Sequence, residues 1–440
     1  MNDLSDAALE TADPTMNPDL SPPARDGYSA KNILFLQGLA TPFFAKLAAR
    51  LANDGHTVHR MHFCGGDWVF RGKAHRGVFH HRVSCAAANL ETFYRDFITH
   101  ENIHTVILFG DCRPIHMAMR TVARETGTQV YVFDEGYTRP HWVTMEADGS
   151  NGYSRMPRTA QEIAVLHAAL TKRDRIVRPE TETNMARRAR MDILAHAGNI
   201  LFKWRFPHYR SHRPAGVLSE AKGWIKRGFN SWRYSADNRR TLACFEQTTQ
   251  PYFLVPLQLN SDYQIRVHSR FSGMVEFIEE VIASFAANAP EGCQLFFKNH
   301  PLDNGMIDYR RIIGATAARH GISDKVSFAE GGNLDALIRG CEGVVLVNST
   351  VGFATLRLGC PLKVLGTALY DLDGLTDQKP LDMFWQNPVR PQQRLADEFL
   401  TVVQTYTQIR GDLFSEDGIS VAVAEAADVL SGKKRRLPSG

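Results

Sequence analysis

Short apolar runs alternate with amphipathic stretches in the first part of the chain. Strands are expected at residues 32–36, 57–61, 105–109 and 129–133, with helices between them at 42–54, 82–101 and 116–126. A strand, a glycine turn, a helix and a second strand make the βαβ unit of a parallel sheet. This part of the sequence therefore predicts a doubly wound α/β domain.

The same alternation returns after a helical stretch that is rich in arginine. Strands are expected at residues 252–257, 293–298, 326–328, 343–347 and 361–365, with helices between them at 273–288, 308–320 and 334–339. The economical interpretation is an α/β fold in which two Rossmann-type doubly wound domains face a central cleft. We predict a disordered leader (1–27), an N-terminal Rossmann-like domain (28–160), a helical, basic-aromatic connecting region (161–245), a C-terminal Rossmann-like nucleotide-binding domain (246–375) and a helical tail (376–440).

Composition narrows the class of protein and its compartment. The chain has 440 residues, of which 44% are hydrophobic and 22% charged, as in ordinary globular proteins. Its seven cysteines are scattered, which argues against a disulfide framework or a zinc site. The first residues lack the basic and apolar regions of a signal peptide, and no apolar run reaches the roughly 18 residues of a spanning helix. We therefore expect a cytoplasmic protein, with membrane contact limited to the surface of the bilayer.

The strand ends of the C-terminal domain carry residues suited to phosphate. Ligands of open α/β sheets bind outside the carboxyl ends of the strands. The segment 348–352 opens a helix there, although Ser349 or Thr350 could serve only as a helix cap. Lys298 ends another strand and supplies a positive charge, unless it is simply solvated. The expected nucleotide-binding residues are Gln258, Lys298, His300, Pro301, Asn348, Ser349, Thr350 and Gly352.

The strand ends of the N-terminal domain carry carboxylates. Asp134 and Glu135 follow one strand, and Asp111 follows its neighbour. Glycosyl transfer needs a carboxylate that attacks or stabilises the anomeric carbon, or takes the acceptor proton. The catalytic candidates are therefore Asp111, Asp134 and Glu135, and the substrate-binding candidates are Gln37, Gly38, Arg113, His116 and Arg139. A structural alternative is that Asp134 caps a turn and Glu135 pairs with Arg139.

Several motifs occur in an order that is typical of one protein family. They are Phe35-Leu36-Gln37-Gly38, Gly65-Gly66-Asp67, the segment 108–116, the segment 133–140, Val255-Pro256-Leu257-Gln258 and Lys298-Asn299-His300-Pro301. On these motifs the chain resembles the capsule polysaccharide biosynthesis and export proteins, and most closely the KpsS-type branch. One departure is the segment 63–67, where relatives often carry an Asn-rich stretch.

The resemblance implies a GT-B-like pair of domains and a retaining β-Kdo transferase. Such an enzyme takes Kdo from CMP-Kdo, its donor substrate, and places it on a phospholipid or lipid-linked acceptor at the cytoplasmic face of the inner membrane. By the same resemblance Glu135 lies at the position of a catalytic carboxylate, while Lys298, His300, Ser349 and Thr350 bind the CMP portion. No cofactor or metal is implied, and other capsule synthesis or export proteins are expected partners. The alternatives are a non-catalytic glycolipid-binding adaptor for export and a GT-B-fold enzyme that uses another nucleotide sugar or epimerises a UDP-sugar.

A basic and aromatic stretch at residues 203–233 indicates a further partner. Its cations are Lys203, Arg205, Arg210, Arg213, Lys222, Lys226, Arg227 and Arg233, interleaved with Trp204, Phe206, Trp224, Phe229 and Trp232. This composition suits an anionic lipid surface or a lipid acceptor. An ordinary helical face that packs on the core is the structural alternative, and nucleic acid is disfavoured because no RNA-binding motif accompanies the stretch. We expect His56, His59, His62, His80 and His81 to be packing residues, and Cys112 to be a buried thiol.

Overall fold

The computed structural model describes residues 30–138, 140–170, 185–209, 217–260 and 262–433. The chain divides into two units. The first consists of residues 1–155, 172–212 and 403–440, and the second of residues 156–171 and 213–402. Predicted residues outside the described ranges include the leader and Arg139, whose roles stay predictions.

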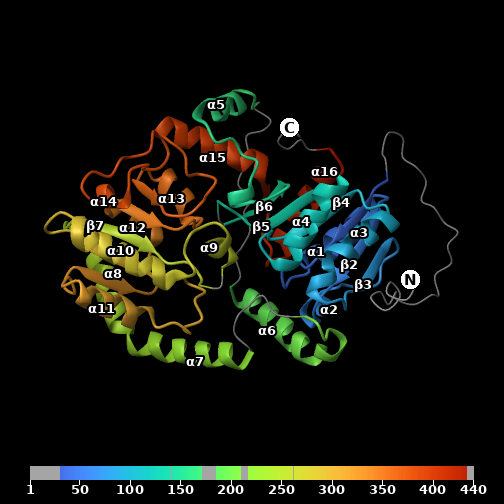
Figure 1. Cartoon of the computed structure of the whole chain (residues 1–440), viewed down its shortest axis with the longest axis horizontal. Coiled ribbons are helices and arrows are strands. Elements are labelled where there is room, and N and C mark those ends of the chain that lie inside the picture. Colours follow the sequence, from blue (N-terminus) through green and yellow to red (C-terminus); the bar gives the residue numbers. More distant parts are fainter. Residues whose placement is uncertain (1–29, 139, 171–184, 210–216, 261, 434–440) are drawn as a thin grey trace. The chain divides into compact units, whose positions relative to one another are not determined.

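A mixed sheet forms the centre of the first unit (Figure 1). Its strands lie in the order β12-β6-β5-β4-β1-β2-β3. The strands β1 to β5 are parallel, and β6 pairs antiparallel with both β5 and β12. The bounds are β1 Asn32–Phe35, β2 Thr57–His62, β3 Val78–Arg82, β4 Thr105–Phe109, β5 Gln129–Glu135, β6 Trp142–Ala147 and β12 Gln408–Arg410. The helices are α1 Phe43–Asn53, α2 Gly65–Val69, α3 Leu90–His100, α4 Pro114–Thr126, α6 Met185–Leu201 and α16 Glu416–Leu430, with 3₁₀ turns at Ala87–Asn89, Asn151–Tyr153 and Lys203–Arg205.

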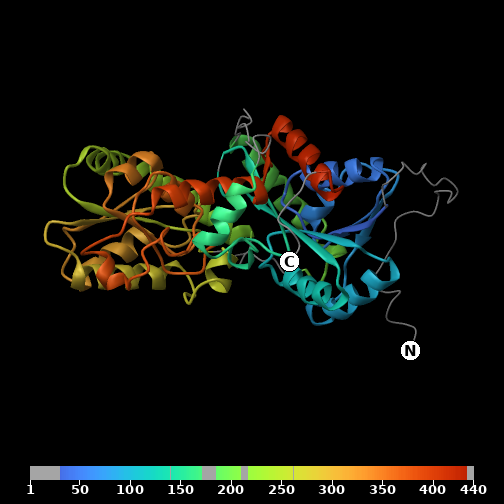
Figure 2. The ribbon, with the colours of Figure 1, turned by 90° about the horizontal axis from the view of Figure 1, so that it is seen from above.

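Both faces of this sheet are covered by helices. Figure 2 shows α16 in red and α1 in blue above the sheet, and the blue-green helices α3 and α4 below it. Ile33, Phe35 and Phe133 pack with α1 and α16, whereas Leu34 and Val132 pack with α3 and α4. Adjacent strand residues thus enter opposite cores, which explains the almost continuous apolar runs of the sequence. The two cores hold the strand ends in fixed positions.

The second unit contains a five-stranded parallel sheet in the order β11-β10-β7-β8-β9. The strands are β7 Tyr252–Pro256, β8 Gln294–Lys298, β9 Val326–Ala329, β10 Gly343–Leu346 and β11 Leu362–Val364. The helices are α5 Ala160–Ala168, α7 Val217–Arg233, α8 Ser235–Gln247, α9 Tyr263–Val267, α10 Met274–Asn288, α11 Tyr309–Arg319, α12 Leu334–Gly340, α13 Val351–Arg357, α14 Leu381–Phe384 and α15 Gln393–Thr407, the last continuing into the first unit. The core on one side of this sheet is aromatic, with Phe253, Phe285 and Trp385 in mutual edge contacts.

The predicted α/β class with parallel sheets is confirmed, while the cleft between the domains stays a prediction. The helix predicted at 82–101 starts only at Leu90; Arg82 ends an unpredicted edge strand, and a 3₁₀ turn at Ala87–Asn89 precedes the helix. The strands β6 and β12 were not predicted either. The regions 161–245 and 376–440 were each predicted as one piece, but the chain divides both between the two units. Residues 408–410 pair with β6 and α16 packs on α1, which places β12 and α16 in the first unit.

Two pairs of histidines join β2 to β3. Nδ1 of His59 lies 3.0 Å from Nε2 of His81, and Nε2 of His62 lies 2.9 Å from Nδ1 of His80. Burial lowers the pKa of all four side chains, to about 4 for His80 and about 3 for His81. These imidazoles are therefore neutral in the folded protein at neutral pH.

We predict that this edge of the sheet loses stability as the pH falls. Histidines of the unfolded chain take up protons below about pH 6.5, whereas the folded pairs resist protonation, so the unfolded state binds more protons. His81, with a folded pKa of about 3, removes up to about 1.4 kcal/mol of unfolding free energy per pH unit between pH 6.5 and 4, and the lowered pKa of His62 acts in the same direction. Hydrogen exchange of β2 and β3 should accelerate from pH 7.5 to 5 once corrected for intrinsic rates. The His81→Leu variant should show a smaller change, and His320→Gln, an exposed control, the parental one. An equal response in all three proteins would contradict the prediction.

Candidate functional site

The carboxyl ends of β1, β2, β4 and β5 bring the predicted N-terminal residues to one edge of the first sheet. These four strands are neighbours and parallel, so the segments that follow them lie at the same edge. Gln37 and Gly38 follow β1, Arg113 follows β4, and Asp134 and Glu135 end β5. The sequence-predicted convergence in this unit is thus present.

A hydrogen-bonded cluster surrounds the buried amide of Gln37. Its Nε2 lies 3.3 Å from Oδ2 of Asp67 and 3.4 Å from the hydroxyl of Tyr209. Nη1 of Arg113 donates to Oε1 of Gln37 at 3.2 Å and to the carbonyl of Gly38 at 3.3 Å. Gln37 thereby links loops that follow three different strands, which favours a positioning role.

Asp67 belongs to one of the motifs of the family resemblance, but the sequence predicted no site role for it. Burial raises the pKa of its carboxyl. Two contacts lower this pKa in part: the backbone N–H of Phe63, which donates to Oδ2 at 2.9 Å, and the charge of Arg113. Burial also lowers the pKa of Arg113, which the nearby Tyr209, Asp67 and Asp134 partly offset. A carboxyl with a raised pKa is suited to proton transfer. The available signals were the motif Gly65-Gly66-Asp67 and its place in α2, the helix that follows β2, since the other candidates also follow strands.

Asp134 and Glu135 occupy different environments although they are adjacent. Successive strand residues point to opposite faces, so Asp134 shares the side of Val132 and Glu135 that of Phe133. Glu135 accepts two hydrogen bonds from Arg188 of α6, at 2.5 and 3.2 Å. This bidentate pair fixes the carboxylate. The partner of Glu135 in the described part of the chain is therefore Arg188, which no local sequence signal indicated.

Asp111 and His116 hold the loop after β4. Asp111 is fully buried, and its Oδ2 accepts from the backbone N–H of Ser150 at 2.9 Å. Nδ1 of His116, also fully buried, donates to the carbonyl of Gly110 at 2.5 Å. Burial of this kind favours a loop-fixing role over the predicted contacts with substrate. The Cys112 side chain is buried, as predicted.

In the second unit, the carboxyl ends of three neighbouring strands carry the predicted nucleotide residues. The strands β10, β7 and β8 lie side by side; Asn348 and Gln258 follow the ends of β10 and β7, and Lys298 is the last residue of β8. Nε2 of Gln258 donates to Oδ1 of Asn348 at 2.9 Å, and the backbone N–H of Asn348 donates back to Oε1 at 3.1 Å. Both side chains are buried, so this pair ties two strand ends together.

Lys298 is a buried cation at the end of β8. Only 8% of the residue is exposed, and burial lowers the pKa of its ammonium group. Within the described part of the chain it has neither a carboxylate partner nor a side-chain hydrogen bond. A buried charge without a partner is costly, so the site is suited to a bound anion. Beside it, Nδ1 of His300 accepts from the backbone N–H of Leu302 at 3.0 Å, which fixes the ring, while Pro301 is exposed.

Ser349, Thr350 and Gly352 shape the turn into α13. Oγ of Ser349 accepts from the N–H of Val351 at 3.3 Å, whereas the Thr350 side chain makes no capping hydrogen bond. Gly352 lies against the ring of Tyr370, where a Cβ atom would overlap the aromatic carbons. The helix has only seven residues, so its dipole contributes little to anion binding. The local reason for glycine at position 352 is close packing.

The Gly352→Ala variant should therefore be destabilised by about 1–3 kcal/mol through overpacking. The matched control is Gly314→Ala in α11, where nothing lies within 4 Å of an added Cβ atom. That control should gain about 0.5–1 kcal/mol because alanine favours a helix. Thermal unfolding of both variants measures the difference. Equal melting temperatures would show that Tyr370 accommodates the methyl group.

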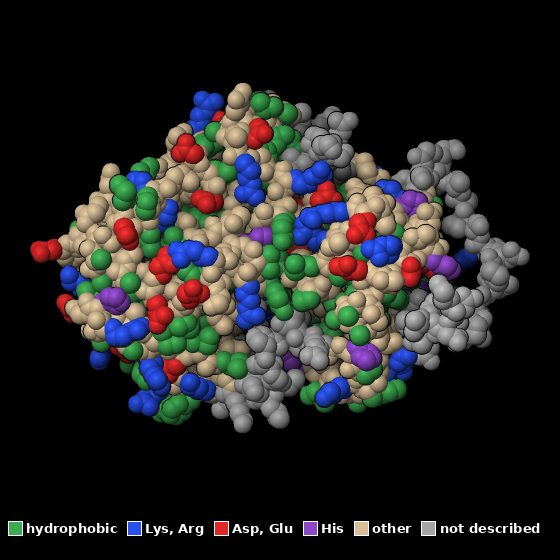
Figure 3. Space-filling view, in the orientation of Figure 1, with side chains coloured by type: hydrophobic (Ala, Val, Ile, Leu, Met, Phe, Trp, Pro, Cys, Tyr) green, Lys and Arg blue, Asp and Glu red, His purple; other side chains and the backbone are tan. Residues whose placement is uncertain are grey.

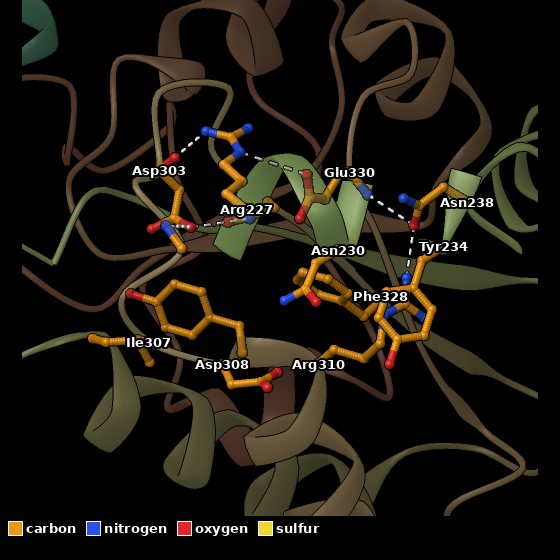
Figure 4. A pocket seen from close by; sticks show the side chains of 13 residues that line it. Arg227, Asn230, Tyr234, Asn238, Asp303, Ile307, Asp308, Arg310, Phe328 and Glu330 are labelled. Atoms are coloured by element: carbon orange, nitrogen blue, oxygen red, sulfur yellow. Dashed lines mark hydrogen bonds and ion pairs between the residues drawn. The ribbon is translucent and has the colours of Figure 1, made fainter. Parts of the chain in front are cut away.

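An open pocket lies at the β8–β9 side of the second unit (Figure 4). Its charged side chains are largely paired with one another. Arg227 lies 3.7 Å from Glu330, and Arg310 binds Asp237 at 2.6 Å and Asn238 at 2.7 Å. The pairing neutralises these guanidinium groups. The arginines of this pocket are therefore paired, whereas Lys298 is a buried cation without a carboxylate partner in the described part of the chain.

The comparison with known proteins identifies the family. Residues 104–414 match the model of a family described as capsule polysaccharide biosynthesis protein. The chain belongs to this family. It is 32% identical over 392 residues to the capsule polysaccharide modification protein LipB of Neisseria meningitidis serogroup B, covering 88% of this chain and 93% of LipB. It is also 32% identical over 391 residues to the capsule polysaccharide export protein KpsS of Escherichia coli, covering 87% of this chain and 96% of KpsS.

A solved structure with a similar course of the chain is the β-Kdo 2,7 transferase of Thermosulfurimonas dismutans KpsC. The two are 13% identical, with 92% of this chain and all of the KpsC chain covered, and the TM-score is 0.42. Likeness at this level does not extend to function. Within the described ranges, no three or more His, Cys, Asp or Glu side chains are grouped to hold a metal ion. The described helices also include none with the length and apolarity needed to span a bilayer.

Proposed function

We propose that this member of the capsule polysaccharide biosynthesis family is a retaining glycosyltransferase that moves Kdo from CMP-Kdo to a lipid or lipid-linked acceptor. The observation that carries the proposal is the buried Lys298. Its ammonium group suits the phosphate of a nucleotide sugar, and the ends of β7 and, beyond it, β10 lie on one side of its strand. The choice of CMP-Kdo and of a lipid acceptor rests on the resemblance of the motifs to the KpsS-type branch.

The proposed reaction has two displacements at the anomeric carbon. The Glu135 carboxylate, oriented by Arg188, attacks that carbon and forms a glycosyl ester while the bond to the CMP oxygen breaks. Lys298 and His300 stabilise the phosphate that carries the departing charge. The acceptor hydroxyl then displaces the carboxylate and gives its proton to Asp67, whose pKa burial has raised. Two inversions give net retention.

The decisive test is release of CMP from CMP-Kdo by the purified protein, with and without lyso-phosphatidylglycerol. We expect release that depends on the lipid, together with a mass increase of the lipid by one Kdo unit. Release without a product on the lipid would indicate another acceptor class. Saturable lipid binding without any CMP release would favour an adaptor in capsule export and overturn the enzymatic proposal.

A further inference from the structure

The helix α6 presents an apolar face to solvent. The exposed fractions are 67% for Ile193, 53% for Leu194, 62% for Ile200, 67% for Leu201 and 72% for Trp204 in the following turn. Their spacing of one, seven, eight and eleven residues from Ile193 places them on one side of a helix. Isolated exposed apolar residues are common, but a continuous stripe of large side chains marks an interaction surface.

The opposite face of α6 is attached firmly to the first unit. Met191, Ala195 and Gly198 are buried there. Gly198 crosses Gly65 of α2 so closely that a Cβ atom on either residue would overlap the backbone of the other. The side chain of Asn199 accepts from the N–H of Gly66 at 2.7 Å, and Arg188 binds Glu135. The apolar stripe is thus displayed by a well-packed helix.

Basic residues accompany the stripe. From Met185 to Phe206 the sequence contains five Arg or Lys residues, Arg187, Arg188, Arg190, Lys203 and Arg205, and a single acid, Asp192. Arg190 and Lys203 are exposed, and the guanidinium of Arg205 lies 5.3 Å from the centre of the Trp204 ring. Figure 3 shows hydrophobic and basic side chains together on the surface near α6. Tryptophan beside cations suits the headgroup region of an anionic bilayer.

We propose that the stripe Ile193, Leu194, Ile200, Leu201 and Trp204 docks on an anionic lipid bilayer. Apolar side chains enter the acyl boundary while Arg190 and Lys203 meet the lipid phosphates. The same helix binds Glu135 through Arg188, so docking brings a membrane lipid to the catalytic edge of the first sheet. This link to catalysis rests on the proposed function, whereas docking itself does not.

The structure thereby revises where the membrane contact of the 203–233 stretch lies. Trp204 continues the α6 stripe, but Phe206 is buried against the first unit, with its ring 6.5 Å from that of Trp68. Phe229 and Trp232 are exposed on α7 of the second unit, with ring centres 6.0 Å apart. Arg210 and Arg213 lie outside the described residues, as do the side chains of Lys222 and Trp224. The stripe on α6 is therefore placed largely upstream of the stretch that the sequence indicated.

The test is sedimentation of the full-length protein with vesicles, without any nucleotide sugar. Vesicles of phosphatidylcholine with 30% phosphatidylglycerol, a composition of about one anionic lipid in three, are compared with pure phosphatidylcholine. We expect binding to the anionic vesicles, weakened at least tenfold by the double change Ile200→Asp and Leu201→Asp. The matched control is Met117→Asp, an exposed apolar residue on α4 of the same unit, which should bind like the parent. Circular dichroism verifies that each variant is folded.

Equal binding of the parent and the double variant would overturn the assignment of α6, and equal binding to both vesicle types would overturn its electrostatic part. A parental dimer that the double variant loses, without vesicle binding by either protein, would show that a second copy covers the stripe.

CMP release with a short-chain, water-soluble acceptor separates this inference from the proposed function. A double variant that loses vesicle binding but keeps that release supports docking and leaves the enzyme intact. If the parent protein binds vesicles but releases no CMP, only the proposed transferase activity is contradicted.

Discussion

The Glu135→Gln variant is expected to lose turnover by at least about a thousandfold while it binds CMP as tightly as the parent protein. An amide lacks the charge that a nucleophile needs, and the removal of a nucleophile eliminates a covalent step rather than a binding contact. Gln retains an oxygen that accepts from Arg188, so the local structure should persist. CMP release from CMP-Kdo measures turnover, and isothermal titration with CMP measures binding.

The Asp134→Asn variant is the matched control, because Asp134 lies on the opposite side of the same strand end. It should retain much more activity than Glu135→Gln. The reverse order of activities would transfer the nucleophile role to Asp134, and parental rates in both variants would refute the covalent mechanism. The Arg188→Lys variant keeps the positive charge but cannot donate two parallel hydrogen bonds to Glu135. If Arg188 positions Glu135, this variant should have a lower kcat and nearly the same KM.

The strand ends were predictable because apolar runs of four to six residues locate parallel strands, and ligand sites follow their carboxyl ends. This rule selected Gln37, Arg113 and Lys298 before their neighbours were known. It also selected Asp111, which turns inward and is fully buried, as is His116 of the neighbouring family motif. Position along a strand gives the edge of the sheet, but the direction of a side chain beyond the strand depends on tertiary contacts.

What the sequence did not predict depends on contacts between distant segments. The three residues 408–410 become a strand only because β6 offers an edge more than two hundred residues earlier. Arg188 reaches Glu135 across 53 positions, and Tyr209 reaches Gln37 across 172. The membrane prediction relied on composition alone, whereas the exposed stripe of α6 depends on which side of the helix Gly198 attaches to the first unit. Contacts of this kind leave no local pattern in the sequence.

The Lys298→Met variant is expected to bind CMP about 10- to 100-fold more weakly while its nucleotide-free form becomes more stable. A hydrogen bond to a charged group contributes about 1.5–3 kcal/mol, which gives the loss in affinity. The buried ammonium group has no carboxylate partner in the described chain, so an apolar side chain of similar length removes a desolvation cost. A gain of about 1 kcal/mol would raise the melting temperature by roughly 2–4 °C.

Thermal unfolding with and without CMP measures both effects in one experiment, because a ligand stabilises the folded state according to its affinity. The control is Lys325→Met, which lies immediately before β9 and therefore at the opposite, amino end of the sheet. It should keep the CMP-induced shift of the parent. A less stable Lys298→Met protein with an unchanged CMP shift would mean that Lys298 supports the fold alone. A more stable protein without a CMP shift is the outcome that a phosphate-binding lysine requires, since only an anionic ligand compensates for burying its charge.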